Sequence, residues 1–177
     1  MTTATSPSAA PAVPATLRRL YLVRFGFALV WALLLLVSAS KLGPLSVTLL
    51  VLYPLFDVAA AVVDLRSSKN QVLLANIVIS ALATVGLAIA AASGIPAVLR
   101  VWGAWAIVAG LVQLVVAVRR RALGGQWPMI LSGGISVLAG SSFALMASAD
   151  DPSLANVGGY AILGGIFFLV SALRLRG

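Results

Sequence analysis

One apolar stretch constrains the fold more than any other, because it is long enough to cross a bilayer and still carries two carboxylates. It runs from Pro44 to Arg66 and reads PLSVTLLVLYPLFDVAAAVVDLR. A helix needs about 20 apolar residues to cross the hydrocarbon core. The stretch also contains Asp57 and Asp64, and an ionised carboxylate near the bilayer centre costs about 2.5–3.5 kcal/mol on insertion scales. Asp57 therefore needs a basic partner, a proton or water.

The composition extends this argument to the whole chain. Of its 177 residues, 62% are hydrophobic and 9% are charged, whereas soluble domains average about 45–50% apolar and about 25% charged residues. This predicts an integral membrane protein whose main partner is the lipid bilayer. The net charge of +8 is typical of nucleic-acid binding, but the basic residues stand in short runs between apolar spans. That placement indicates membrane orientation instead, and we expect no nucleic-acid partner.

The predicted fold class is all-α, an integral membrane six-helix bundle built from three repeated transmembrane hairpins. The apolar spans cover about residues 20–39, 44–65, 71–92, 97–118, 127–147 and 154–173. Residues 1–17 are rich in Ala, Pro, Thr and Ser and have no hydrophobic periodicity. They are therefore predicted to form a disordered tail, which leaves residues 18–177 as one transmembrane domain.

The first span has an alternative interpretation as a signal peptide. Arg18 and Arg19 precede it, and Val37-Ser38-Ala39 is typical of a cleavage site. The hydrophobic region of a signal peptide usually has about 7–15 residues, and this span is longer. We therefore favour a retained transmembrane helix.

The distribution of Lys and Arg predicts the orientation. Only Lys41 and Arg100 fall on one side of the predicted bundle. The other side receives the remaining ten of the twelve basic residues: Arg18, Arg19, Arg24, Arg66, Lys69, Arg119, Arg120, Arg121, Arg174 and Arg176. Loops rich in Lys and Arg remain cytoplasmic, so both termini are predicted to be cytoplasmic.

Three similar segments indicate an internal repeat. They are Tyr53–Asp57, Trp105–Ala109 and Tyr160–Gly164, which follow one another at spacings of 52 and 55 residues. Each is preceded by a turn that contains proline and is followed by a basic exit. Repeats with the same orientation are related by an axis along the membrane normal.

Arg24 is the predicted partner of the buried carboxylates. It enters from the cytoplasmic end of the first span, and antiparallel packing places it at a depth between Asp57 and Asp64. We predict an intramembrane ion pair that neutralises the carboxylate. The alternative is that Asp57 relays protons or ions.

Several polar residues recur on the later spans. They are predicted to pack between helices, since small and polar residues let membrane helices approach and hydrogen-bond; a polar pathway through the bundle is the alternative. The candidate packing residues are Asn76, Gln113, Ser132 and Ser136.

The membrane interfaces have their own predicted residues. Trp102 and Trp105 lie near the outer end of the fourth span and are expected in the aromatic belt. Arg119, Arg120 and Arg121 close that span. They are expected to set the orientation, and they are also the candidate contacts for anionic lipid.

The chain has few side chains of the types that catalyse reactions. The chain has no Cys and no His, and its only side-chain carboxylates are Asp57, Asp64, Asp150 and Asp151. Thiol and imidazole catalysis is thereby excluded. We predict no catalytic, cofactor or metal site, and we do not expect an enzyme.

The segment from Trp102 to Gly140 resembles the bacterial acid-resistance membrane proteins of the HdeD family. The most specific features are a helix that ends in a basic run, then Gly125-Gln126-Trp127, then a helix with Gly133-Gly134. The resemblance implies a six-helix protein of the bacterial inner membrane with a role in acid or stress tolerance. It supplies no catalytic residues. Asp57 departs from the pattern, because a small residue is expected at its position.

Two functions follow as hypotheses. The first is a non-enzymatic multi-pass membrane protein of the HdeD-like type, involved in acid or stress tolerance. The alternative is a small transporter or channel subunit that uses Asp57 as an intramembrane carboxylate for protons or ions.

Overall fold

The computed structural model describes residues 12–39 and 41–175, and long helices account for most of them. The predicted all-α six-helix bundle is confirmed. Each of the six helices is long and apolar enough to cross a membrane, so the chain is a multi-pass membrane protein. The helices are α1 (Ala12–Ser38), α2 (Pro44–Ser68), α3 (Val72–Ala90), α4 (Ile95–Arg119), α5 (Trp127–Met146) and α6 (Ala155–Arg174), with short 3₁₀ turns η1 (Ala91–Ser93) and η2 (Arg121–Leu123).

The N-terminal boundary differs from the predicted one. The disordered tail was expected to reach residue 17, whereas α1 begins at Ala12. Leu17 is buried, and Arg18 donates hydrogen bonds from Nε to the Ala172 carbonyl at 3.1 Å and from Nη2 to the Leu175 carbonyl at 3.2 Å. These contacts with the end of α6 give the early turns of α1 a packed surface that composition did not reveal. The rest of the predicted tail lies outside the described residues.

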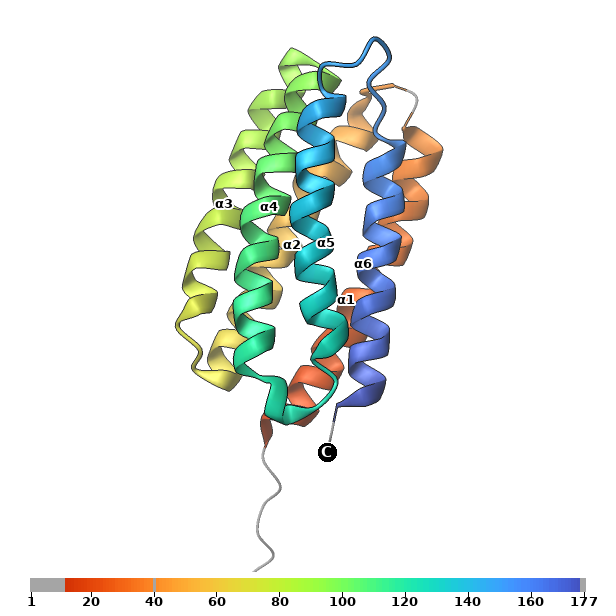
Figure 1. Cartoon of the computed structure of the whole chain (residues 1–177). Helices are drawn as coiled ribbons and strands as arrows, with labels where there is room; N and C mark the ends of the chain where they lie inside the picture. The colour runs from red at the N-terminus through yellow and green to blue at the C-terminus, as the bar shows by residue number, and fades with distance from the viewer. Residues whose placement is uncertain (1–11, 40, 176–177) are drawn as a thin grey trace, which may run out of the picture.

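The six helices form a closed ring in chain order. Each helix packs against the next, and α6 returns to pack against α1 (Figure 1). The most extensive contacts are those of α4 with α5, of α1 with α6 and of α2 with α3. All three join different predicted hairpins, while the two helices within each hairpin touch less extensively. The threefold repeat itself stays a prediction.

Proline and glycine begin several helices. Pro44, Pro96 and Pro128 occupy the first two positions of α2, α4 and α5, where a missing N–H has no intrahelical acceptor to lose. Gly43 caps α2, and its N–H donates to Ser46 Oγ at 2.9 Å. The α2–α3 and α4–α5 connections lie at the same end of the bundle as the first turn of α1 and the last turn of α6 (Figure 1). We call this the basic end.

Glycines bring α4 and α5 into backbone contact. A Cβ atom added to Gly103 would lie 2.5 Å from the carbonyl oxygen of Gly140, and one added to Gly140 would lie 2.5 Å from that of Gly103. Gly110 and Gly133 meet in the same way, at 2.8 Å. Close approach through small residues is the usual way in which membrane helices gain packing energy.

An aromatic cluster fills the bundle on the side away from the basic end. It consists of Trp31, Tyr53, Trp102 and Trp105, with ring centroids 4.6 to 5.9 Å apart. The interface placement predicted for Trp102 and Trp105 is wrong, because only 0% and 8% of their surfaces are exposed. Position near the end of a span does not reveal which face of a helix points inward.

Candidate functional site

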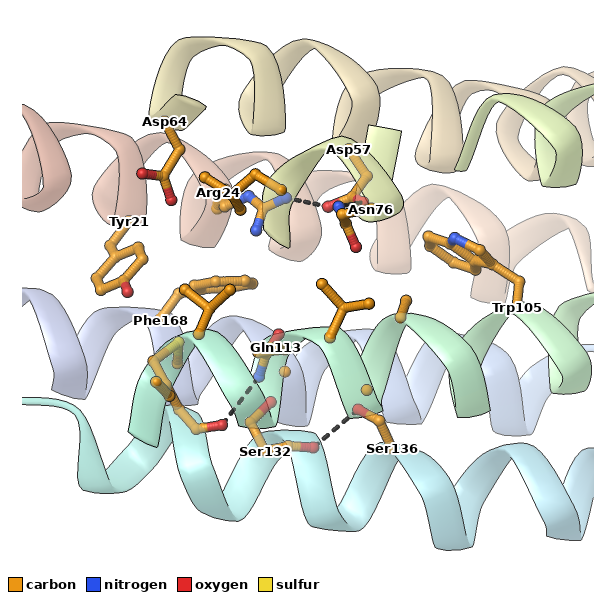
Figure 2. Close-up of a pocket in the computed structure, with 18 of the residues that line it drawn as sticks. Tyr21, Arg24, Asp57, Asp64, Asn76, Trp105, Gln113, Ser132, Ser136 and Phe168 are labelled. Atoms are coloured by element: carbon orange, nitrogen blue, oxygen red, sulfur yellow. Dashed lines mark hydrogen bonds and ion pairs between the residues drawn. The ribbon is translucent and has the colours of Figure 1, made fainter. Parts of the chain in front are cut away.

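A polar cavity lies inside the ring, and every helix contributes to its wall. Its volume is about 100 Å³, which has room for several water molecules. The charged or polar residues that line it are Tyr21, Arg24, Tyr53, Asp57, Asp64, Asn76, Gln113, Arg120, Ser132, Ser136 and Tyr160. Figure 2 shows two facing walls, with Arg24, Asp57 and Asn76 on one side and Gln113, Ser132 and Ser136 on the other.

Asp57 is the centre of the first wall. Its Oδ1 accepts a hydrogen bond from Arg24 Nη2 in an ion pair. Its Oδ2 accepts from Asn76 Nδ2 at 2.6 Å and from Ser80 Oγ at 2.8 Å. Trp105 Nε1 in turn donates to Ser80 Oγ at 3.0 Å. The carboxylate is thus held by residues of α1 and α3, and its negative charge is compensated within the bundle.

Arg24 also contacts an aromatic ring on the neighbouring helix α6. Its guanidinium carbon lies 4.9 Å from the centroid of the Phe168 ring on α6, within the range of a cation–π interaction. The Arg24 and Asp57 side chains are 16% and 14% exposed. The pair therefore faces the cavity and is not sealed within the protein.

The second wall is hydrogen-bonded within and between α4, α5 and α6. Gln113 Nε2 donates to the Met129 carbonyl at 3.1 Å, and Tyr160 Oη donates to Ser136 Oγ at 2.8 Å. Ser136 Oγ in turn donates to the Ser132 carbonyl at 2.8 Å. This wall supplies neutral donors and acceptors, which suits water or a small polar molecule.

A second ion pair lies at the basic end of the cavity. Arg120 donates to both oxygens of Asp64, at 2.8 Å and 2.7 Å, and to Ser68 Oγ at 2.6 Å. Burial acts to lower the pKa of Arg120, but the hydrogen bonds and charge of Asp64 outweigh it and leave this pKa above its ordinary value. This bidentate arrangement is stronger and more directional than a single hydrogen bond.

The ionisable groups that line the cavity come from four helices or their ends. The aromatic ones are Tyr21 of α1, Tyr53 of α2 and Tyr160 of α6; the charged ones are Arg24, Asp57, Asp64 and Arg120. The charged residues form two complete pairs, so the cavity wall has no net charge. Within residues 12–39 and 41–175, no three His, Cys, Asp or Glu side chains gather as metal ligands.

Some of the sequence-predicted site residues come together and others separate. Arg24 forms an ion pair with Asp57. Asp64 lies at the basic end of the cavity and pairs with Arg120 instead. The candidate packing residues Asn76, Gln113, Ser132 and Ser136 all line the cavity. Their polar groups therefore belong to its walls as well as to the helix contacts.

Sequence reasoning missed the pairing of Arg120 with Asp64. Ser80 follows Asn76 at an interval of four residues on α3, and this spacing predicts that the two side chains share a face. Arg120 had no such signal. It is the middle residue of a basic run, and its pairing with Asp64 depends on the contact between distant segments.

No protein-family model, curated protein or solved structure matches this chain. The resemblance to the HdeD family therefore stays a prediction.

Proposed function

We propose that this protein is a small transporter or channel subunit that carries protons or small ions through the central cavity. The observation that supports the proposal is an ion pair, Arg24–Asp57, facing a polar cavity lined by all six helices. Ionisable residues inside a membrane bundle are costly and characteristically mark ion or substrate pathways.

In this proposal Asp57 is the proton acceptor. A proton that reaches the cavity converts the carboxylate to a carboxylic acid and removes its charge attraction to Arg24. Asn76 and Ser80 still hold the protonated group through their hydrogen bonds. Arg24, which remains charged, then faces the cavity without a counterion and can accept a small anion. Release of the proton restores the original pair.

Passage also requires the aromatic cluster to rearrange. Trp31 and Trp102 stack at 5.5 Å between ring centroids, and both are almost completely buried. Their side chains close the bundle beyond the cavity. A transport cycle must therefore open two barriers, namely this cluster and the Asp64–Arg120 pair at the basic end.

Proton flux into proteoliposomes that contain a trapped pH-sensitive dye tests the proposal. The decisive variant combines Arg24→Gln with Asp57→Asn, because it removes both charges together and leaves hydrogen-bonding groups in place. We expect it to fold and to lose the flux. Asp150→Asn and Asp151→Asn remove exposed carboxylates outside the cavity and should retain it. Wild-type flux no faster than in empty vesicles, or full flux in the doubly neutral variant, would overturn the proposal.

Acid or stress tolerance is a second proposal, favoured by the scarcity of groups that acid can protonate. The chain has no His and only four side-chain carboxylates, so its charge changes little as the pH falls. Survival of a deletion strain at low pH, with and without the wild-type gene, tests this role. If the doubly neutral variant restores survival, tolerance does not depend on transport through the Arg24–Asp57 pair. If the deletion strain survives as well as the wild type, the protein has no role in tolerance.

A further inference from the structure

A second hollow opens at the basic end, away from the central cavity. Its volume is about 330 Å³, which is in the size range of small-ligand sites. It is lined by Arg121 and Ala122 of η2, by the turn Gly124–Gln126, by the start of α5 and by Arg174 at the end of α6. We call this hollow the arginine cleft.

The arginine cleft brings together two cations from distant segments. Arg121 and Arg174 are both exposed, and neither forms an ion pair with the described residues. None of the residues that line the cleft is acidic. The cleft therefore has positive charge without an internal counterion, in contrast to the paired charges of the central cavity.

The turn that forms the cleft floor is tightly built. Gly124 and Gly125 have φ values of 70° and 62°, a region that favours glycine. A Cβ atom on Gly125 would lie 2.7 Å from the Ser171 carbonyl oxygen. Ser171 Oγ donates to the Gly125 carbonyl. These contacts hold the end of α6, which carries Arg174, against the turn that follows Arg121.

Gln126 adds an unpartnered polar group to the same cleft. Only 2% of its surface is exposed, and its Nε2 donates to the Gly124 carbonyl at 3.1 Å. Its Oε1 is buried without a hydrogen-bond partner in the described part of the chain. A buried acceptor of this kind normally has a donor.

The cleft lies at the level expected for lipid headgroups. It belongs to the end of the bundle where α4 stops and α5 begins, and Trp127 beside it is 73% exposed. An exposed Trp at the end of a membrane span is typical of the interface between lipid and water. A ligand in the cleft can therefore remain anchored in the bilayer by its acyl chains.

We propose that the arginine cleft binds the headgroup of an anionic phospholipid, with Arg121 and Arg174 on the phosphate. Arginine suits phosphate because its donors match two oxygens at once. This site replaces the predicted run Arg119–Arg121, since Arg120 is engaged by Asp64 and Arg119 does not line the cleft.

Thermal unfolding in mild detergent, with added lipid, tests the proposal. A ligand that binds the folded state raises the melting temperature. Dioleoyl phosphatidylglycerol should raise it, whereas dioleoyl phosphatidylcholine and inorganic phosphate should raise it much less. The variant Arg121→Gln with Arg174→Gln should weaken the apparent lipid affinity by about tenfold or more, which corresponds to about 1.4 kcal/mol. Neither arginine side chain donates a hydrogen bond to the described residues, so this variant should fold.

A matched variant distinguishes lipid binding in the arginine cleft from nonspecific electrostatic attraction. Arg66→Gln with Arg119→Gln removes the same number of exposed charges at the same end and should keep the wild-type shift. Equal losses in both double variants would overturn the proposal. So would an equal shift with phosphatidylcholine, which would show no preference for negative charge, or an equal shift with inorganic phosphate, which would show a soluble ligand.

Discussion

At the scale of single residues, the two carboxylates of α2 have separate partners from separate helices. Asp57 pairs with Arg24 and Asp64 with Arg120, although both carboxylates lie on one helix. Removing one partner of a buried pair leaves a charge without its counterion inside the bundle, and this typically costs about 3–5 kcal/mol. The two pairs should therefore behave as independent units in double-mutant cycles.

Arg24→Ala should lower the free energy of unfolding in mild detergent by up to about 3–5 kcal/mol. Removing Asp57 as well should recover part of the loss, because the carboxylate no longer lacks a counterion. Combining Arg24→Ala with Asp64→Ala should instead give nearly additive losses. Chemical denaturation of these three variants, and of Asp57→Ala and Asp64→Ala alone, measures the coupling, and equal coupling of Arg24 to both carboxylates would contradict the separate pairs.

Neighbouring arginines provide a second comparison. Arg120→Ala should destabilise the folded protein by about 3–5 kcal/mol, since it leaves Asp64 unpaired. Arg119→Ala should change stability by less than about 0.5 kcal/mol, because exposed positions away from structural contacts are usually tolerant. Melting of the two purified variants provides the measurement. Similar losses would mean that the Asp64 pair contributes nothing beyond an ordinary surface charge.

The sequence predicted a contact only where the depths of two residues in their membrane spans matched. Arg24 could be placed near Asp57 and Asp64 from sequence, because all three interrupt apolar spans of antiparallel neighbours, but the sequence did not decide between the two carboxylates. The partner of Asp64 could not be deduced, since three consecutive arginines point in three directions around a helix axis. Only the packed position of α4 decides that Arg120 faces inward.

At the scale of helices, the α4–α5 contact depends on four glycines. Gly103→Ala or Gly140→Ala would force a methyl group to within 2.5 Å of a carbonyl oxygen on the facing helix. We expect a loss of at least about 1–3 kcal/mol, the usual cost of overpacking. Gly134→Ala on α5, the helix of Gly140, is the matched control, because a Cβ atom there meets nothing within 4 Å. Detergent melting distinguishes them, and equal stability of all three variants would contradict backbone contact.

Helix existence was predictable, while helix faces were not. Apolar runs of membrane-spanning length, bounded by Pro, Gly and basic residues, indicate six helices without any tertiary information. The hydrophobicity of such helices is similar on the lipid and protein sides, so periodicity does not mark the buried face. For this reason Trp102 and Trp105 were assigned to the interface and yet lie in the core.

At the scale of the whole molecule, closure of the ring creates the central cavity. Its wall needs α6 to return to α1, and this contact joins residues more than 150 positions apart, as in the hydrogen bonds from Arg18 to the end of α6. Sequence spacing predicts three hairpins but not their order around a ring. The cavity therefore could not be located from sequence, although most of its polar residues were singled out there.

The distribution of basic residues predicts the orientation of this ring in the membrane. Of the basic residues that the structure describes, nine belong to the end that holds the α2–α3 and α4–α5 connections, or to the segments that lead into it, whereas Lys41 and Arg100 belong to the other end. Because the chain has no native Cys, single cysteines can be labelled without background. Cys in place of exposed Gln71, at the basic end, should be protected from an impermeant maleimide added outside intact cells. Cys in place of exposed Asp151, at the opposite end, should react. Both positions should react after the membrane is permeabilised, which controls for accessibility. The reverse pattern in intact cells would place the basic end outside, and the arginine cleft would then face the outer leaflet.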